Sequence, residues 1–272
     1  MYPATGFTKG ELIDFYTRAA PALLPHLRGR PLTLKRYPNG VDDKFFYEKN
    51  CPSHRPDWVR TARVDEIDYC LCDDLPTLVW MANLADLELH PSLSLAKEIE
   101  RPTVMAFDLD PGKPAGIMEC RDVALLLRDT LERIGLRCFP KTSGSKGIQV
   151  YAPLNSDGVT YDDTKPLSQA LARHLEAEHP KLIVSQQKKE LRRGKVLIDW
   201  SQNDEHKTTV SVYSLRARER PTVSTPLTWD ELEAAEGPDD LSFTADEVLE
   251  RVAEHGDLFA PVRELQQQLP EL

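Results

Sequence analysis

Two aspartates separated by one residue follow an apolar run near the middle of the chain. The run covers residues 103–107, and Asp108, Leu109 and Asp110 come next, before a Pro-Gly turn. Alternate side chains of a strand point to the same face, so a strand here places both carboxylates side by side. Two such anions repel each other unless a cation lies between them, and Mg2+ and Mn2+ prefer carboxylate oxygens. The alternative is a solvated turn in which Asp110 caps the segment that follows.

A third carboxylate occurs in the same setting. Asp199 ends the apolar run 196–198, which has the composition of a buried strand. If the two strands lie side by side, Asp199 joins Asp108 and Asp110 at one edge of a sheet. Three carboxylates can hold two metal ions about 3.5–4 Å apart, which activates an attacking oxygen and stabilises a leaving one in phosphoryl transfer. The alternative role for Asp199 is to cap its strand.

A Ser/Gly-rich loop at 142–147 separates two predicted strands. Its glycines allow backbone N–H groups to face an anion, Ser143 and Ser145 add hydroxyl donors, and Lys146 adds charge. It does not match the Walker consensus, so an ordinary turn is the alternative interpretation. Arg216 has the planar side chain that binds a terminal phosphate through two hydrogen bonds.

Aromatic residues at 45–47 precede Lys49, and this combination is typical of surfaces on which bases stack. Strand alternation requires at least one of these rings to leave the core side, although packing inside the protein is the alternative. His90 follows another apolar run just before a proline. A role beside a metal or a sugar is one interpretation of His90, and a purely structural role is the other.

The 272-residue chain carries a formal net charge of −10, which argues against indiscriminate coating of nucleic acid. Basic clusters at 35–49, 188–195 and 216–220 nevertheless suit a polyanionic substrate. No apolar stretch approaches the ~18 residues that span a bilayer, and we expect a cytoplasmic protein without a membrane partner. The five cysteines, at positions 51, 70, 72, 120 and 138, show no zinc-site spacing and are predicted to be reduced thiols.

The elements that position these groups follow from hydrophobic periodicity and from turn residues. A capping box, Thr8 with Glu11, predicts the start of the first helix. Helices are predicted at 8–27, 76–84, 120–135, 161–178 and 243–255, and strands at 32–37, 44–49, 69–72, 87–90, 103–110, 137–141, 148–152, 196–200 and 208–213. The absence of a regular β-α-β rhythm favours an α+β fold.

These pieces, in this order, resemble the archaeo-eukaryotic primase superfamily, and more narrowly the polymerase domain of bacterial LigD-type end-joining proteins and stand-alone Prim-PolC-like polymerases. The resemblance covers essentially the whole chain. Its motifs are modest one by one, but their joint order and spacing are specific. The segments that carry it are 34–40, 87–90, 107–112, 142–147, 194–203 and 213–218.

The resemblance implies a single primase-polymerase domain over 1–272, with an N-terminal α/β module at 1–86 and an RRM-like catalytic sheet with a C-terminal helix at 87–272. It implies a template-directed nucleotidyltransferase that fills short gaps or joined ends in DNA repair and tolerates ribonucleotides. Two ions, Mn2+ or Mg2+, are implied as cofactors. Implied partners are DNA with gaps or ends, preferably bearing a 5′-phosphate, NTP or dNTP, Ku and a separate ligase. The implied location is the bacterial nucleoid.

Matching positions assign roles to individual residues. Asp108, Asp110 and Asp199 become the catalytic metal carboxylates, with His90 beside the metal and the sugar. The implied nucleotide-binding residues are Lys35, Phe46, Tyr47, Ser143, Lys146, Gln149, Gln202 and Arg216. The implied DNA-binding residues are Lys9, Arg36, Lys49 and Arg192.

Two departures from the family pattern affect these expectations. The phosphate loop usually continues to a histidine, where this chain has Gln149, so we expect weaker triphosphate binding. Relatives begin earlier, with groups that hold a downstream 5′-phosphate, and of that set only Lys9 is present here. Two other functions remain open: a non-catalytic module that binds DNA gaps or ends, and a haloacid-dehalogenase-like phosphatase, whose Asp-x-Asp motif lies on a strand but is followed by other residues.

Overall fold

The computed structural model describes residues 1–270, which divide into two compact units. The first unit contains Met1–Ile99, Thr208–Thr225 and Phe243–Asp257. The second contains Glu100–Lys207, Pro226–Ser242 and the chain from residue 258 onward. These bounds differ from the expected modules 1–86 and 87–272. The reason is that the strand at Asp86–Pro91 pairs with Leu32–Arg36, so it belongs to the first unit.

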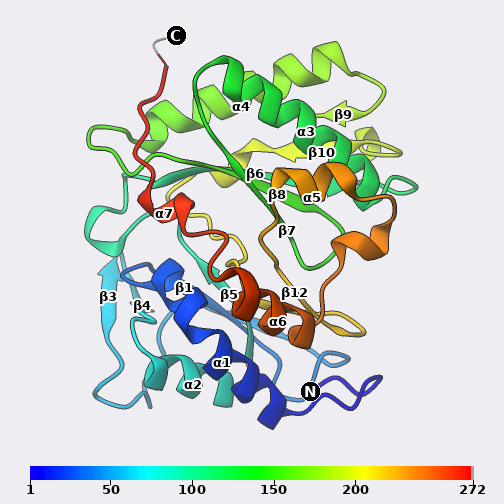
Figure 1. Cartoon of the computed structure of the whole chain (residues 1–272). Helices are drawn as coiled ribbons and strands as arrows, with labels where there is room; N and C mark the ends of the chain where they lie inside the picture. Colours follow the sequence, from blue (N-terminus) through cyan, green and yellow to red (C-terminus); the bar gives the residue numbers. More distant parts are fainter. Residues whose placement is uncertain (271–272) are drawn as a thin grey trace. The chain divides into compact units, whose positions relative to one another are not determined.

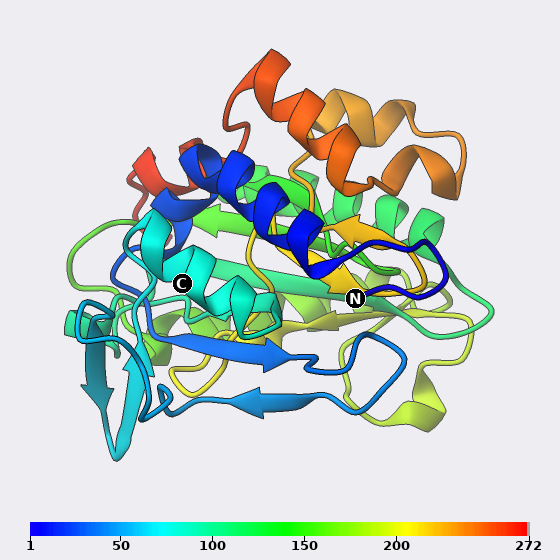
Figure 2. The same cartoon turned by 90° about the horizontal axis from the view of Figure 1, so that it is seen from below.

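Two helices and a five-stranded sheet form most of the first unit. Helix α1 (Lys9–Leu27) begins at the predicted capping box of Thr8 and Glu11 and packs beside α2 (Leu75–Asn83). Figure 2 shows both helices on the same side of strand β1. The strands are β1 (Leu32–Arg36), β2 (Phe46–Glu48), β3 (Thr61–Val64), β4 (Ile67–Cys70) and β5 (Asp86–Pro91), and a short helix η1 (Ala96–Glu98) follows them.

Strand β1 organises this sheet, because it pairs antiparallel with β2, β4 and β5. The predicted hairpin of 32–37 and 44–49 is therefore present, with Lys35 opposite Tyr47. Later parts of the chain complete the unit: the hairpin of β11 (Leu215–Ala217) and β12 (Pro221–Val223), and helix α6 (Ala245–His255).

The predicted strand at 208–213 is wrong. Thr208 makes only an isolated bridge with Ser92, and the N–H groups of Thr209 and Ser211 donate singly to carbonyls of β5. Tyr213 then takes a positive φ of 61°, which no continuous strand contains. The segment lies along β5 without forming a ladder.

The second unit is built on a five-stranded sheet in the order β7-β8-β6-β10-β9. Helices α3 (Ile117–Arg133) and α4 (Tyr161–Glu178) lie on the same side of this sheet (Figure 1). The strands are β6 (Val104–Pro111), β7 (Phe139–Thr142), β8 (Ile148–Pro153), β9 (Ile183–Val184) and β10 (Val196–Asp199). The shorter helices are η2 (Lys189–Leu191), η3 (Trp200–Gln202), α5 (Trp229–Ala234), η4 (Pro238–Leu241) and α7 (Pro261–Glu264).

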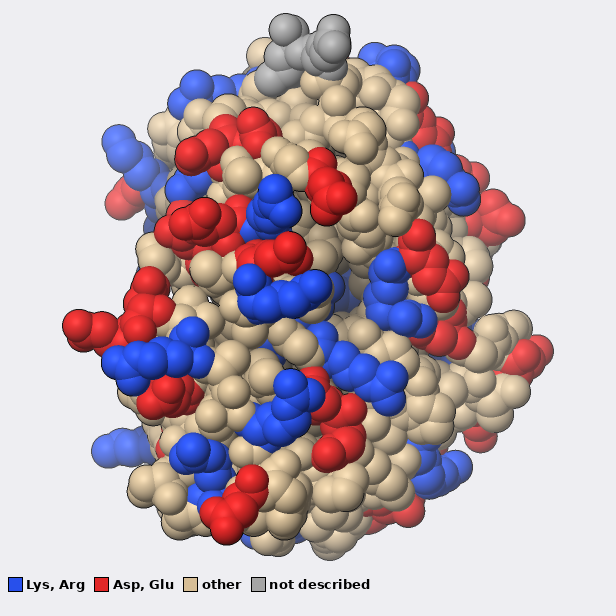
Figure 3. Space-filling model, turned by 90° about the vertical axis from the view of Figure 1, so that its left-hand side faces the viewer, with Lys and Arg blue, Asp and Glu red and all other residues tan. Residues whose placement is uncertain are grey.

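Charged side chains of both signs are interspersed on the face drawn in Figure 3. This matches a chain with a net charge of −10 and only local basic clusters. On this face, binding of a polyanion therefore depends on particular side chains rather than on a broadly basic surface. Among residues 1–270, no helix has the length and apolar character needed to cross a bilayer.

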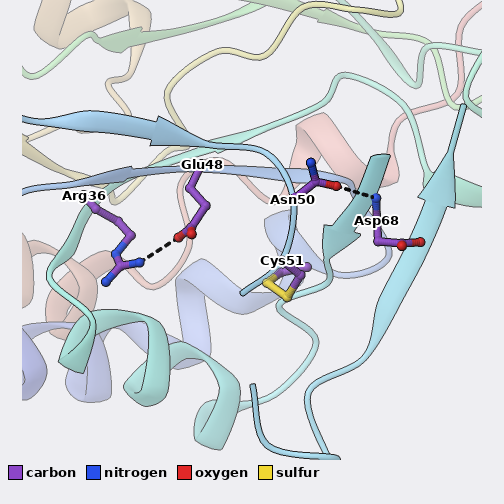
Figure 4. Close-up of a disulfide and its surroundings, with 6 residues drawn as sticks. Arg36, Glu48, Asn50, Cys51 and Asp68 are labelled. Carbon is purple, nitrogen blue, oxygen red and sulfur yellow. Dashed lines mark hydrogen bonds and ion pairs between the residues drawn. A yellow bond between two sulfur atoms is a disulfide. The ribbon is translucent and has the colours of Figure 1, made fainter. Parts of the chain in front are cut away.

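The prediction that all five cysteines are reduced is wrong for one pair. Cys51 and Cys70 form a disulfide, drawn in Figure 4, whereas Cys72, Cys120 and Cys138 are free and buried. The pair is 19 residues apart in sequence and has no recognisable spacing. The two cysteines lie close together because the Cys51 N–H donates to the carbonyl of Asp68, which precedes Cys70 by two residues in β4. The Asn50 side chain accepts from the N–H of Asp68 in the same region.

Candidate active site

The three aspartates lie on two paired strands of the second unit. Strand β10 runs antiparallel to β6, and Asp199 is directly opposite Asp108. Asp110 lies two residues further along β6. Leu109, which separates the two aspartates of β6, is fully buried and turns its side chain to the other face. The strand pairing on which the sequence interpretation depended is therefore present.

Each carboxylate has a local hydrogen-bond donor. Gln149 Nε2 donates to Asp108 Oδ1 at 3.1 Å, and Arg192 Nη1 lies 3.4 Å from Asp110 Oδ2. Asp199 accepts from the hydroxyl of Ser201 at 2.6 Å and from Gln202 Nε2 at 3.0 Å. Within residues 1–270, no three His, Cys, Asp or Glu side chains are arranged as a ready metal cage. The strand register thus makes the three aspartates neighbours, and each carboxylate contacts a nearby hydrogen-bond donor or cation.

Burial and negative neighbours dominate the electrostatics of Asp108, although the charge of Lys141 opposes them. Burial raises the pKa of Asp108 to about 6, and the carboxylates of Asp199 and Asp110 act in the same direction. The hydrogen bond from Gln149 opposes the rise only partly. A divalent cation among the three carboxylates would relieve the repulsion, and oxygen donors are the ligands that Mg2+ and Mn2+ take. The donor set therefore fits such an ion.

Behind Asp108 lies a buried lysine that the sequence reasoning missed. Lys141 is fully buried on β7, and its Nζ donates to Gln149 Oε1 at 2.6 Å. Gln149 is opposite both Lys141 and Asp108 in the sheet, so its amide joins the two. The sequence offered one indication of this contact. Lys141 directly precedes the Ser/Gly loop, so a hairpin of the two predicted strands around that loop pairs it with Gln149. Gln149 thus contacts both an aspartate and a lysine. From the sequence alone, only a contact between Gln149 and the triphosphate was expected.

The loop at 142–147 is held by its own hydroxyl groups. Ser143 Oγ accepts from the N–H groups of Ser145 and Gly147, at 3.3 and 3.1 Å. Gly144 has a φ of +66°, which an L-residue rarely adopts. A Cβ on Gly147 would overlap the carbonyl oxygen of Leu109, so the loop is packed directly against β6. Lys146 is exposed at the tip. The structure therefore places Ser143 and Lys146 in a compact turn next to the aspartate-bearing strand.

Arg192 lies in a loop fixed to the end of β6. The N–H of Gly194 donates to the carbonyl of Gly112, and a Cβ on Gly112 would overlap the carbonyl of Arg192. The Arg192 guanidinium reaches both Asp110 and the backbone carbonyl of Gln187. The residue expected to approach DNA is therefore tied to one of the aspartates.

In the first unit, two predicted nucleotide-binding residues, Lys35 and Arg216, and His90, predicted beside the metal and the sugar, converge on one carboxylate. Lys35 Nζ, His90 Nε2 and Arg216 Nε lie 3.2, 3.1 and 3.3 Å from oxygens of Glu88. Lys35 is on β1, His90 on β5 and Arg216 on β11. Glu88 was missed by sequence reasoning, although its position two residues before His90 puts both side chains on one face of a strand.

The aromatic residues beside this cluster are exposed. Phe45, Phe46 and Tyr47 retain 49, 42 and 58% of their accessible surface. Lys35 Nζ lies 4.5 Å from the centre of the Phe45 ring, and the Arg36 guanidinium lies 5.2 Å from that of Phe46. All three rings therefore leave the core side, next to cations, and their role in base stacking stays a prediction.

The remaining predicted DNA-binding residues are spread over the first unit. Arg36 pairs with Glu48 at 2.8 Å, as Figure 4 shows, and Lys49 is exposed two residues after Tyr47. Lys9 Nζ donates to the carbonyl of Asn83 at the end of α2. The structure assigns these three lysine and arginine residues no shared site.

Comparison with known proteins gives one consistent result. The family model described as "LigD, primase-polymerase domain" matches residues 8–259. The multifunctional non-homologous end joining protein LigD of Mycolicibacterium smegmatis is 40% identical over 268 residues, and the LigD protein of Mycobacterium tuberculosis H37Rv is 42% identical over 270. These alignments cover 96 and 95% of this chain but 35% of either relative, so the chain spans about a third of their length.

A solved structure agrees with the sequence matches. The polymerase domain of Mycobacterium tuberculosis Ligase D, determined in complex with DNA, superposes with a TM-score of 0.90 at 39% identity, covering 98% of this chain and 96% of that one. The match favours neither the phosphatase nor the non-catalytic module. The chain therefore belongs to the LigD primase-polymerase domain family and is a metal-dependent nucleotidyltransferase with the α+β fold of that family.

Proposed function

We propose that this polymerase domain extends a primer along a DNA template, filling short gaps or newly joined ends during repair. The observation that carries the proposal is the pairing of Asp199 with Asp108 on adjacent strands, with Asp110 two residues away. The names of the relatives, which refer to non-homologous end joining, support the setting. The related polymerase domain solved with DNA supports the substrate class.

Two divalent ions, either Mn2+ or Mg2+, would be held by Asp108, Asp110 and Asp199. When bound, such ions lower the pKa of an attacking hydroxyl and stabilise charge on a leaving pyrophosphate. The protein's own contribution is to fix the carboxylates: Gln149 orients Asp108, and Ser201 and Gln202 orient Asp199. The amide of Gln202 can also turn to a nucleotide, as the family resemblance implies.

Each unit carries groups suited to phosphate or base. In the first unit, Lys35 and Arg216 supply positive charge, and Phe46 and Tyr47 supply stacking faces. In the second unit, Ser143 and Lys146 form the turn that suits a phosphate. We propose Lys9, Arg36, Lys49 and Arg192 as contacts to DNA phosphates. Selection of the nucleotide then comes from base pairing with the template, because phosphate contacts carry no sequence information.

We further propose that the chain acts with Ku and a DNA ligase in the bacterial cytoplasm, close to the nucleoid. The relatives match this chain over about a third of their length and are described as multifunctional end-joining proteins. A polymerase domain leaves a nick after filling a gap, so a sealing activity has to follow. A 5′-phosphate at the far side of the gap is the feature that such a ligation requires.

The test is extension of a primer across a gap of one to three nucleotides, with NTP or dNTP and with Mn2+ or Mg2+. Asp110→Ala removes one carboxylate at a half-exposed position and is expected to abolish extension while leaving the thermal unfolding temperature close to that of the wild type. Asp122→Ala, an exposed aspartate on α3, is the matched control and should extend normally. Full extension by purified Asp110→Ala would contradict the assignment of the metal carboxylates.

A further inference from the structure

Glu88 is a carboxylate at the centre of the cationic cluster of the first unit, and no role has yet been assigned to it. Oε1 lies within 3.0–3.3 Å of Lys35 Nζ, the Tyr37 hydroxyl and the N–H of Ala217. Oε2 lies 3.1 Å from His90 Nε2 and 3.3 Å from Arg216 Nε. Four hydrogen-bond donors and the guanidinium of Arg216, as an ion-pair partner, therefore meet at one carboxylate.

We propose that Glu88 is a positioning residue that holds Lys35, His90 and Arg216 in the arrangement that binds the phosphates and sugar of a nucleoside triphosphate. This inference rests on the proposed function, because Lys35 and Arg216 are nucleotide-binding groups in it and the family resemblance places His90 beside the sugar. Glu88 itself is not a catalytic residue: its side chain is 2% exposed and contacts protein groups on both oxygens. It acts through its neighbours.

The side chain of Glu88 is ionised although it is buried. A buried carboxylate is stable only when donors and positive charge surround it. Burial raises the pKa of Glu88, but the hydrogen bond from His90 and the charges of Arg216 and Lys35 outweigh it and hold this pKa far below its usual range. A neutral amide in its place offers one oxygen acceptor instead of two, so His90 loses its acceptor at Oε2 and Arg216 loses its ion-pair partner.

The same carboxylate fixes the orientation of His90. An ionised carboxylate only accepts hydrogen bonds, so Nε2 of His90 must carry the proton and donate it to Glu88. The other ring nitrogen, Nδ1, then keeps its lone pair for a ligand. Carboxylate partners orient ligand-binding histidines in this way in many proteins. Without Glu88, the ring can rotate and change its tautomer.

Glu88 also keeps two like charges close together. The positive charges of Lys35 and Arg216 repel each other. The negative charge of Glu88, with which both residues pair, offsets this repulsion. The rings of Phe45 and Tyr47 lie 4.5 and 5.7 Å from Lys35 Nζ and limit its other positions. Two cations against one carboxylate leave the cluster with a net positive charge, which suits a phosphate group.

The experiment compares Glu88→Gln and Glu88→Asp with the wild type in three measurements. These are the equilibrium Kd for ATP and for adenosine, the KM for ATP and for primer-template in gap filling, and the thermal unfolding temperature. Asp86→Asn is the matched control, because Asp86 is a buried carboxyl on the same strand that meets the cluster only through Oδ1, which accepts from the backbone N–H of Lys35, and asparagine keeps that acceptor. Loss of a charged hydrogen-bonding network typically costs about 10- to 100-fold in binding.

We expect Glu88→Gln to raise the Kd and the KM for ATP about 10- to 100-fold, with little change for adenosine or primer-template. Glu88→Asp keeps the charge and should restore part of the ATP affinity, whereas Asp86→Asn should bind ATP like the wild type. Tighter ATP binding by Glu88→Gln would overturn the proposal, because a carboxylate that only offsets positive charge weakens anion binding. An unchanged Kd, or an equal loss of ATP and primer-template binding, would also overturn it.

The two proposals fail separately in this design. If the wild type binds ATP but does not extend a primer, the proposed function is wrong, and the Kd values still decide the role of Glu88. If the wild type extends and Glu88→Gln has the Kd and KM of the wild type, only the role of Glu88 is wrong. If the wild type does not bind ATP at all, both are wrong.

Discussion

At the scale of single residues, Gln149 shows how a departure from a family pattern gains a physical explanation. A histidine is usual at this place, and the sequence alone suggested only a weaker contact to phosphate. In the structure, the amide accepts from Lys141 with its oxygen and donates to Asp108 with its nitrogen. An amide side chain is both donor and acceptor and does not titrate, so it keeps both hydrogen bonds at every pH at which the protein is folded. Gln149 therefore couples a buried lysine to a carboxylate of the proposed metal site.

Lys141→Met tests this coupling. Methionine fills a similar volume but leaves the Gln149 oxygen without the lysine donor, so the amide no longer holds Asp108 firmly. Removing a partner of this kind typically costs about 10- to 100-fold in metal affinity or activity. We expect the Mn2+ concentration for half-maximal extension to rise by that amount, measured by metal titration. Lys181→Met, at an exposed lysine, is the control, and an unchanged Mn2+ requirement in Lys141→Met would contradict the coupling.

Asp86 leads to a prediction about pH and stability. Burial raises the pKa of Asp86 well above its ordinary value, and Oδ2 has no partner among residues 1–270. Below about pH 4 both the folded and the unfolded chain hold the proton. As the pH rises, the unfolded chain ionises first, so this residue lowers the free energy of unfolding.

Asp86→Asn removes that pH dependence. The variant should unfold at a higher temperature than the wild type at pH 7, and the difference should shrink toward pH 4. Thermal unfolding of both proteins between pH 4 and 8 measures this. Asp14→Asn, at an exposed position on α1, should follow the wild type throughout. A difference that grows on acidification would contradict the assigned direction of the pKa shift.

At the scale of elements, the parts of the site that were predictable lie on long, strongly patterned segments. The apolar runs before Asp108 and Asp199 predicted β6 and β10, and the capping box predicted the start of α1. The short strands β3, β9, β11 and β12 have two to four residues each and were missed. β3 pairs with β4 and β11 pairs with β12 across short turns, while β9 pairs with β10, but runs this short have no period to detect. The Cys51–Cys70 disulfide was missed because its separation of 19 residues forms no recognisable pattern.

Gly147→Ala tests the packing of the 142–147 loop against β6. An added Cβ would overlap the carbonyl oxygen of Leu109, so either the loop or the strand has to move. Overpacking of this kind costs about 1–3 kcal/mol. We expect that loss in the free energy of unfolding from urea titration, together with a higher KM for the nucleotide.

Gly237→Ala is the control for that substitution, because the added Cβ meets open space. It should unfold at the urea concentration of the wild type. A Gly147→Ala protein with unchanged stability and KM would show that the loop does not depend on its contact with Leu109.

At the scale of the whole chain, sequence reasoning identified the fold class and family but not the division into units. The resemblance placed a boundary at residue 86, whereas Thr208–Thr225 and Phe243–Asp257 return to the first unit. Such returns are set by long-range pairing, as when the Ala217 N–H donates to Glu88, 129 residues earlier. No local pattern encodes them. Glu88 was overlooked for this reason, because its partners are dispersed in sequence.

The charge of the whole chain predicts how it binds DNA. With a net charge of −10, attraction must come from a few local contacts, and four are proposed at Lys9, Arg36, Lys49 and Arg192. Each neutralised phosphate contributes about −0.9 to the slope of log affinity against log salt on duplex DNA. We therefore expect a slope of about −3 to −4 for gapped DNA. A broadly basic binding protein gives a steeper one.

Lys49→Ala tests whether Lys49 makes a specific contact with a DNA phosphate or contributes only to the total charge. Losing one phosphate contact should reduce the magnitude of the salt slope by about 1 and weaken binding to all sequences equally. Fluorescence anisotropy with gapped DNA at several salt concentrations measures both quantities. Lys181→Ala, at an exposed lysine outside the proposed contacts, should leave the slope unchanged. If both variants lower the slope equally, binding depends on total charge, and the assignment of Lys49 as a specific DNA contact is wrong.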